Sequence, residues 1–204
     1  MDARTFALAF VALVLGAAAA HAQSRGSAAD KVAPALRELL APRHGNQICF
    51  ARTYDDAHMR AHPKQKVRRM SLLIEVEHIK EDNLYRYNFT LRVAMKGRGK
   101  MLETSGECGW AYGDKPPQGS MIRCGVECDG GGVDIEQQRG TGNLLVHLTD
   151  VDQKGQPGRP GRIRMAVCGD DDEENSVDLV SGADDRTFRL SKAPASTCGA
   201  SGER

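Results

Sequence analysis

The alternation of apolar and polar residues from Leu84 to Met95 is the feature that most constrains how this chain can fold. Tyr85, Tyr87, Phe89, Leu91, Val93 and Met95 alternate with Arg86, Asn88, Thr90 and Arg92. A period of two is typical of a β-strand with one buried face and one solvated face. Further segments of the same period follow one another from Arg69 to Met165, separated by turn residues. The pattern predicts an all-β domain built as an antiparallel meander.

Turn chemistry and apolar faces together predict a register for each hairpin. The best registers also place opposite charges in contact on the outer face, in the pairs Glu75–Arg86, Arg92–Glu103 and Arg123–Glu136. The predicted two-residue turns are Gly97-Arg98, Asp129-Gly130 and Gly140-Thr141. The last of these turns sets Asp134 opposite His147. A slip of one residue in any hairpin would turn its apolar face outward.

Eight or nine consecutive antiparallel strands with one apolar face must hide that face. Rolling into a closed barrel hides it and also removes the sheet edges. We therefore expect a lipocalin-like, up-and-down barrel, preceded by a short N-terminal helix that carries Leu36 and Leu39. The segment 161–169 would be the eighth strand and would close the barrel against the first. A two-sheet β-sandwich is the alternative.

The first 22 residues have the features of an export signal. An apolar run from Phe6 to Ala20 precedes a small-residue cleavage site, Ala20-His21-Ala22, before Gln23. We expect a leader and short helix over 23–45, a single β domain over 46–198 and a flexible tail over 199–204. The expected location is periplasmic or secreted, with no membrane span after cleavage.

Six cysteines follow the predicted signal, and an oxidising compartment favours their pairing. The register that places Cys108 directly opposite Cys124 predicts a disulfide between them, since opposed strand residues lie within bonding distance. Closure of the first strand against the eighth predicts a second pair. The complete predicted set is Cys108–Cys124, Cys49–Cys168 and, as the remaining pair, Cys128–Cys198.

Two kinds of binding site are candidates. Small inward residues beside aromatic ones could leave a pocket for an apolar ligand near one mouth of the barrel, lined by Tyr85, Tyr87, Thr104, Gly106 and Trp110. The densest group of acidic residues could hold calcium as the one possible cofactor, through Asp170, Asp172, Glu174 and Asp178, although it fails the EF-hand pattern. The pair His58 and His62 could offer two imidazoles to a metal, but Pro63 favours a surface loop there.

Charge is distributed unevenly in a chain whose net charge is only +1. Between Arg43 and Arg69 there are seven Lys and Arg against two Asp, while Asp170 to Asp185 holds eight acids and no base. Such runs are usually solvated loops, and they can also steer charged partners. The outer-face arginines are matched to glutamates, so nothing indicates a nucleic-acid partner.

The sequence carries no nucleophile elbow, zinc-protease motif or phosphate-binding glycine loop, and Asp134 opposite His147 is an ordinary cross-strand contact. We therefore expect a binding module without enzymatic activity. Its partner would be a small apolar ligand held inside the barrel or a periplasmic protein recognised by its loops. A calcium-tuned structural envelope protein, using residues 170–185, is the alternative.

Overall fold

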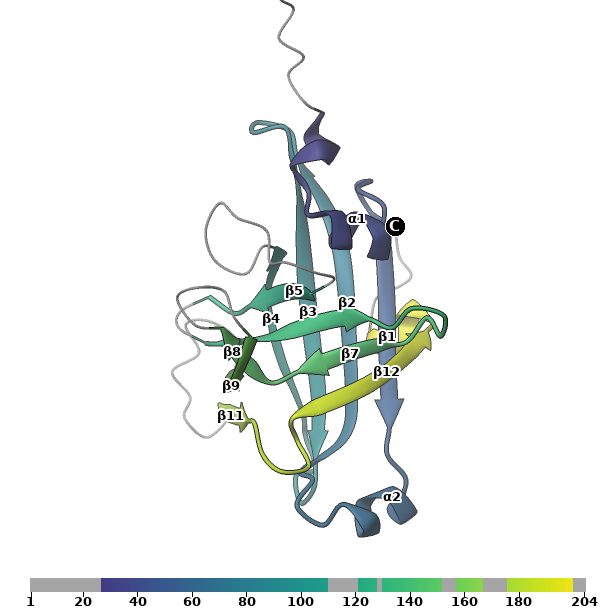
Figure 1. The fold of residues 1–204 in the computed structure, drawn as a ribbon, viewed down its shortest axis with the longest axis vertical. Coiled ribbons are helices and arrows are strands. Elements are labelled where there is room, and N and C mark those ends of the chain that lie inside the picture. Colours follow the sequence, from purple (N-terminus) through teal and green to yellow (C-terminus); the bar gives the residue numbers. More distant parts are fainter. Residues whose placement is uncertain (1–26, 110–120, 128–129, 152–156, 167–175, 200–204) are drawn as a thin grey trace, which may run out of the picture.

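The computed structural model describes residues 27–109, 121–127, 130–151, 157–166 and 176–199 (Figure 1). Eight strands form a closed barrel in which every neighbouring pair is antiparallel, which confirms the predicted fold class. In order around the barrel they are β1 (Gln47–Thr53), β12 (Thr187–Ala193), β7 (Leu144–His147), β6 (Gly132–Gln137), β5 (Met121–Gly125), β4 (Met101–Gly109), β3 (Leu84–Met95) and β2 (Val67–Ile79).

Four shorter strands form two small sheets beside the barrel: β8 (Thr149–Val151) with β9 (Pro157–Pro160), and β10 (Arg162–Met165) with β11 (Val177–Val180). The β10–β11 sheet is attached beside the start of β6, where Gly131 opposes Ile163 and the Arg164 N–H donates to the Gly130 carbonyl at 2.7 Å. The segment predicted to close the barrel therefore lies outside it. Closure is made by β12, which sets Ala193 opposite Cys49 on β1.

Short helices lie at both ends of the barrel (Figure 1). They are η1 (Ala28–Lys31), α1 (Pro34–Leu39) and, at the far end, α2 (Asp56–Ala61); η2 (Ala195–Cys198) follows β12. Pro34 is the first residue of α1. A backbone N–H at this position has no acceptor within the helix, so proline, which lacks one, is well tolerated there. Leu36 and Leu39 of α1 are buried, and the Tyr87 hydroxyl donates to the Leu40 carbonyl at 2.8 Å. Among the described residues, no helix is long and apolar enough to cross a membrane.

Three predicted registers are confirmed: Arg92 opposes Glu103, Cys108 opposes Cys124, and Asp134 opposes His147. The predicted two-residue turn at Gly97-Arg98 is wrong. The connection spans residues 96–100, and the Arg98 N–H donates to the Met95 carbonyl. Gly97 has a φ of 78° at the third position of that turn, as a type II turn requires.

Two other registers differ from the prediction by two residues. On β2 it is Glu77, not Glu75, that opposes Arg86, and on β5 Arg123 opposes Asp134, not Glu136. Both connections are longer than two residues: the first spans 80–83, and the second is closed by Val126 N–H donating to the Gly131 carbonyl. A shift of two residues keeps every side chain on its face, so the apolar pattern alone does not exclude it.

The structure holds two disulfides in its described part. Cys108–Cys124, with a Cα–Cα distance of 4.0 Å, is the predicted cross-strand pair and is confirmed. Cys49 bonds to Cys198, with a Cα–Cα distance of 6.0 Å, so the predicted pairs Cys49–Cys168 and Cys128–Cys198 are both wrong. The reason is topological, because β12 pairs with β1 and leads directly into η2, which carries Cys198. Cys128 and Cys168 lie outside the described residues.

One hydrophobic core occupies the barrel interior and extends under the β10–β11 sheet. The inward side chains of β1, β2, β3 and β12 supply its largest members, which are each at most 2 % exposed: Phe50, Met70, Tyr87, Phe89 and Phe188. A smaller apolar group lies under η2, where Cys49, Leu73 and Cys198 are buried. The interior is therefore lined by bulky side chains that pack against one another.

Candidate functional site

Three connections meet at the end of the barrel marked by α2 (Figure 1). They are residues 54–66 between β1 and β2, residues 96–100 between β3 and β4, and residues 181–186 between β11 and β12. We call these three segments the basic end. They come from distant parts of the sequence, and hydrogen bonds to one short stretch, Lys64–Val67, hold them together.

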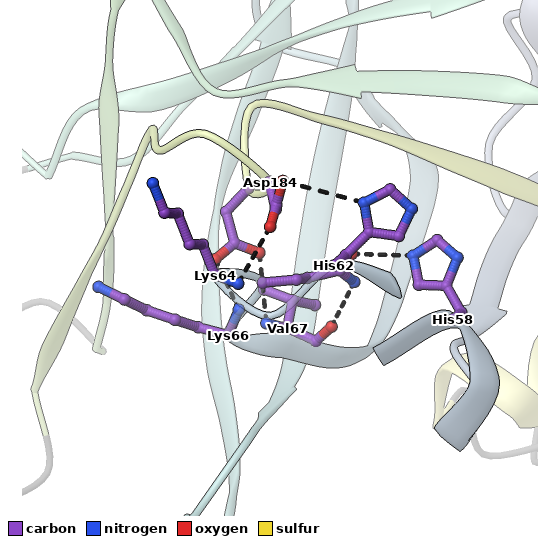
Figure 2. A network of polar contacts seen from close by, with 8 residues as sticks. His58, His62, Lys64, Lys66, Val67 and Asp184 are labelled. Atoms are coloured by element: carbon purple, nitrogen blue, oxygen red, sulfur yellow. Dashed lines mark hydrogen bonds and ion pairs between the residues drawn. The ribbon is translucent and has the colours of Figure 1, made fainter. Parts of the chain in front are cut away.

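Two aspartates of the 181–186 connection bind the backbone of that stretch (Figure 2). Asp184 accepts a hydrogen bond from the Lys64 N–H at 3.0 Å. The two carboxylate oxygens of Asp185 accept from the N–H groups of Lys66 at 2.7 Å and Val67 at 3.3 Å. Because the donors are backbone groups, these hydrogen bonds fix the path of the chain and do not use the lysine side chains.

The 96–100 connection joins the same stretch from the other side, because the Lys96 N–H donates to the Lys66 carbonyl at 2.7 Å. Gln65 fixes the stretch from within. Its side chain is nearly fully buried, donates to the Val67 carbonyl at 2.7 Å and lies 2.9 Å from His58 Nε2. All three loops of the basic end are therefore held as one unit.

Asp185 is the buried centre of this unit, with an exposed fraction of 2 %. Burial raises the pKa of its carboxyl, and the nearby Asp184 carboxylate acts in the same direction. The backbone N–H groups of Lys66 and Val67 and the Lys66 ammonium oppose that rise in pKa. A carboxylate in such a position depends on its hydrogen bonds to offset the cost of leaving water.

The helix α2 begins at a capping aspartate. The Asp55 carboxylate accepts a hydrogen bond from the His58 N–H at 2.7 Å, which satisfies one of the free donors of the first turn. Asp56 follows in the first turn and is ion-paired with Arg68 of β2. Met59 of the same helix is buried in the core. These contacts fix α2 against the end of the barrel.

A row of rings runs along α2. The centroids of Tyr54 and His58 are 4.6 Å apart, those of His58 and His62 are 4.3 Å apart, and the Arg52 guanidinium lies 5.5 Å from the Tyr54 centroid. His62 Nδ1 is 3.8 Å from the Asp184 carboxylate. The two imidazoles lie nearly face to face, with their planes 28° apart, so their ring nitrogens run side by side and do not converge on one metal ion.

The basic end carries a clear excess of positive charge. Its three segments hold seven Lys and Arg against four Asp, giving a net charge of +3 with histidine neutral. The opposite end, formed by residues 27–46 and the turn 80–83, holds four Lys and Arg against four acids and is neutral. The exposed cations of the basic end are Arg60, Lys64, Lys66, Lys96, Arg98, Lys100 and Arg186.

Two large apolar side chains are exposed in the described part of the chain, and both border the basic end. Met101, which is 37 % exposed, directly follows the 96–100 connection. Val180, which is 50 % exposed, directly precedes the 181–186 connection. The basic end is thus a surface that combines several cations with two apolar side chains at its margin.

Most of the residues predicted to line a ligand pocket make contacts within the protein. Tyr87 is 2 % exposed, and its hydroxyl donates a hydrogen bond to the Leu40 carbonyl. Burial raises the pKa of Tyr87 to about 12. The buried Thr104 hydroxyl donates to the Ala166 carbonyl at 3.0 Å, and the Tyr85 ring lies 4.7 Å from that of His78. The remaining members are Gly106, whose backbone abuts Gly125, and Trp110, which lies outside the described residues. Their ligand-binding role remains a prediction.

Of the predicted calcium ligands, Asp178 is the one that the structure describes, and it forms an ion pair with Arg162 at 3.0 Å. Asp170, Asp172 and Glu174 lie outside the described residues. Within the described ranges, no group of three or more His, Cys, Asp or Glu side chains is placed to hold a metal ion.

Asp134, which the prediction set opposite His147, belongs to a buried polar cluster with Arg123 and Thr149. The Asp134 carboxylate is ion-paired with Arg123 at 3.3 Å and accepts a hydrogen bond from the Thr149 hydroxyl. His147 instead contacts the Thr187 hydroxyl through Nδ1 at 3.1 Å, while its Nε2 is 3.9 Å from Glu136. The cluster joins β5, β6 and β8. The Asp134 carboxylate is used by Arg123 and Thr149, so its contacts are those of a structural ion pair.

Sequence reasoning marked the basic stretch and the acidic stretch as separate features and missed their contact. Asp185 and Lys66 are 119 residues apart, and no local pattern indicates that they meet. The positive charge of residues 96–100 was also missed, because the connection was predicted as a two-residue turn. The available signal was the run of Lys96, Arg98 and Lys100 beside two glycines.

Comparison with models of known protein families, with curated proteins and with solved structures finds no match for this chain. Its function must therefore be inferred from its own residues and geometry.

Proposed function

We propose that this protein is a secreted, disulfide-bonded binding module that recognises its partner through the basic end, outside the barrel. The observation that carries the proposal is the joining of three loops on Lys64–Val67, with an excess of three positive charges on the surface they form. Loops held on a rigid scaffold commonly carry binding function. Loops that are already fixed also lose less conformational entropy on binding.

The packing of the interior supports a surface role over an internal ligand. Large side chains such as Phe50 and Phe89 are almost completely buried there, and the polar groups of Tyr87 and Thr104 already have partners within the protein. An eight-stranded barrel can be filled by its own side chains. The proposal therefore assigns recognition to the loops and no catalytic role to the domain.

The disulfides support the proposed location. Disulfides such as Cys108–Cys124 and Cys49–Cys198 persist in oxidising compartments and are rare in the cytosol. The export signal expected over residues 1–22 would bring the chain to such a compartment. A partner at the cell envelope or outside the cell follows from both.

A binding assay on isolated cell envelopes tests the proposal. We expect labelled mature protein to bind envelopes, and the variant K64E/K96E/R98E to lose most of that binding. The matched control K31E/R43E/K80E changes the net charge equally at the neutral end, and we expect it to bind as the wild type does. Equal binding by all three proteins would refute recognition through the basic end.

A further inference from the structure

We propose that the basic end docks on an anionic phospholipid surface. This inference rests on the function proposed above and names the chemistry of the partner.

The acidic groups of the basic end are already engaged by its own chain. Asp55 caps α2 and Asp56 is ion-paired with Arg68. Asp184 and Asp185 accept backbone N–H groups of the Lys64–Val67 stretch. The carboxylates of Asp184 and Asp185 are thus bound to the protein backbone, those of Asp55 and Asp56 are exposed but already have partners, and the exposed cationic side chains outnumber them. The charge presented to a partner is consequently positive.

The remaining cations do not form a site for one small anion. Discrete anion sites usually combine side chains with a group of converging backbone N–H donors. Here the N–H groups of Lys64, Lys66 and Val67 are occupied by the two aspartates. Figure 2 shows the Lys64 and Lys66 side chains extending in a common direction, away from His58 and His62.

Lysine ammonium groups spread over several loops act as separate point charges. Lys64, Lys66 and Lys96 come from two connections joined by the Lys96–Lys66 hydrogen bond, and Arg98 follows on the second. A bilayer surface rich in anionic headgroups attracts such charges additively, without demanding that they converge. The arrangement therefore fits a lipid surface better than a single bound anion.

The exposed apolar side chains strengthen this choice. Proteins that lie on a membrane surface combine electrostatic attraction with shallow burial of apolar groups. Met101 and Val180 stand at the margin of the basic end, on β4 and β11, and they are the large apolar side chains that the described part of the chain exposes. Both would lie near the headgroups when the basic end faces the bilayer.

The test is co-sedimentation of the mature, disulfide-bonded protein with lipid vesicles. We expect binding to vesicles of phosphatidylcholine mixed with phosphatidylglycerol, no binding to phosphatidylcholine alone, and weakening of binding as salt is raised. The variant K64E/K96E/R98E should bind at least on the order of a hundredfold more weakly, since it replaces three electrostatic attractions to the anionic headgroups by repulsions. The control K31E/R43E/K80E should bind as the wild type does.

A second variant separates the apolar contribution. M101S/V180S keeps every charge, and we expect it to bind the anionic vesicles several-fold more weakly than the wild type. A melting curve for each variant confirms that the surface changes leave the fold intact.

The outcomes distinguish this inference from the function it rests on. If the protein binds isolated envelopes through the basic end and does not bind anionic vesicles, the lipid proposal is wrong and the binding function stands, with an acidic protein or polymer as partner. If the two charge-reversal variants lose vesicle binding equally, binding follows net charge alone and the lipid proposal is again overturned.

Discussion

The carboxylate of Asp185 binds the backbone N–H of Lys66, a residue 119 positions earlier in the chain, at 2.7 Å. Replacing Asp185 by alanine leaves two buried backbone donors without acceptors, and we expect a loss of about 1–3 kcal/mol in the free energy of unfolding. Asp184→Ala removes a contact nearer to solvent and should cost about 1 kcal/mol or less. Urea denaturation of both variants measures the difference, and equal losses would contradict the central role of Asp185.

Gly106 is required by close contact between backbones. A Cβ at this position would lie 2.0 Å from the Gly125 carbonyl oxygen, whereas a Cβ at Gly109 on the same strand would meet nothing within 4 Å. We expect Gly106→Ala to destabilise the fold by about 2–3 kcal/mol and Gly109→Ala to be neutral or slightly stabilising. Thermal melting of the two variants checks this, and a neutral Gly106→Ala would show that β4 and β5 separate easily.

The buried pair Arg123–Asp134 should be strongly coupled. Asp134→Ala leaves the guanidinium in a buried site without its carboxylate, and we expect a loss of about 3–5 kcal/mol. Replacing both residues, as R123M/D134L, should cost much less than the sum of the single changes, because no charge is then left unpaired. A double-mutant cycle by urea denaturation measures the coupling, and additivity within about 0.5 kcal/mol would rule it out.

The imidazole of His147 should make stability depend on pH. Burial lowers the pKa of His147 from its ordinary value of 6.5, although Glu136 and Asp134 act to raise it. Below pH 6.5 the unfolded chain therefore binds a proton that the folded protein does not, so this residue reduces stability as the pH falls from about 6.5 towards its lowered pKa.

Urea denaturation at about pH 7.5 and pH 5.5 tests this dependence, with His147→Gln as the comparison. The variant cannot titrate, and its stability should fall less between the two pH values than that of the wild type. Identical pH dependence in both proteins would exclude His147 as the cause.

The cysteine pairing is open to direct mapping. Proteolysis without reduction, followed by mass spectrometry, should give peptides joined through Cys49–Cys198 and Cys108–Cys124. Elimination leaves Cys128 and Cys168 as the expected third pair, and the bridge between Gly131 and Ile163 brings the neighbouring chain segments together. Free thiols at these two positions, or any other connectivity, would contradict the expectation.

The predictable part of the fold is the part that depends on neighbours in sequence. Alternation along β3 gave its inward face, and the hairpin with β4 could be registered to the residue because Arg92–Glu103 and the apolar pairs agree. That register, carried into the next hairpin, led to Cys108–Cys124. Where the turn was longer than its residues suggested, as between β5 and β6, the register was wrong by two, and Arg123 was assigned to Glu136 in place of Asp134.

The parts that failed depend on distant contacts. Whether residues 161–169 or 187–193 close against β1 is decided by how the whole sheet curves, and both segments have suitable apolar residues. The basic end also depends on distant contacts. In the sequence, Asp184 and Asp185 are not distinguished from the other acidic residues between Asp170 and Asp185. Their hydrogen bonds to Lys64–Val67 depend on the closure by β12, which no local pattern encodes.

The pairing of β1 with β12 also bears on the order in which the molecule can fold. The two strands lie near opposite ends of the described chain, and Cys49 is separated from Cys198 by 149 positions. Strands β2 to β4 can pair as soon as they are made, because each hairpin closes a short loop, whereas contacts across such a separation form slowly. The barrel therefore closes only after β12 has been made and has paired with β1. Formation of the Cys49–Cys198 disulfide then indicates that the barrel has closed.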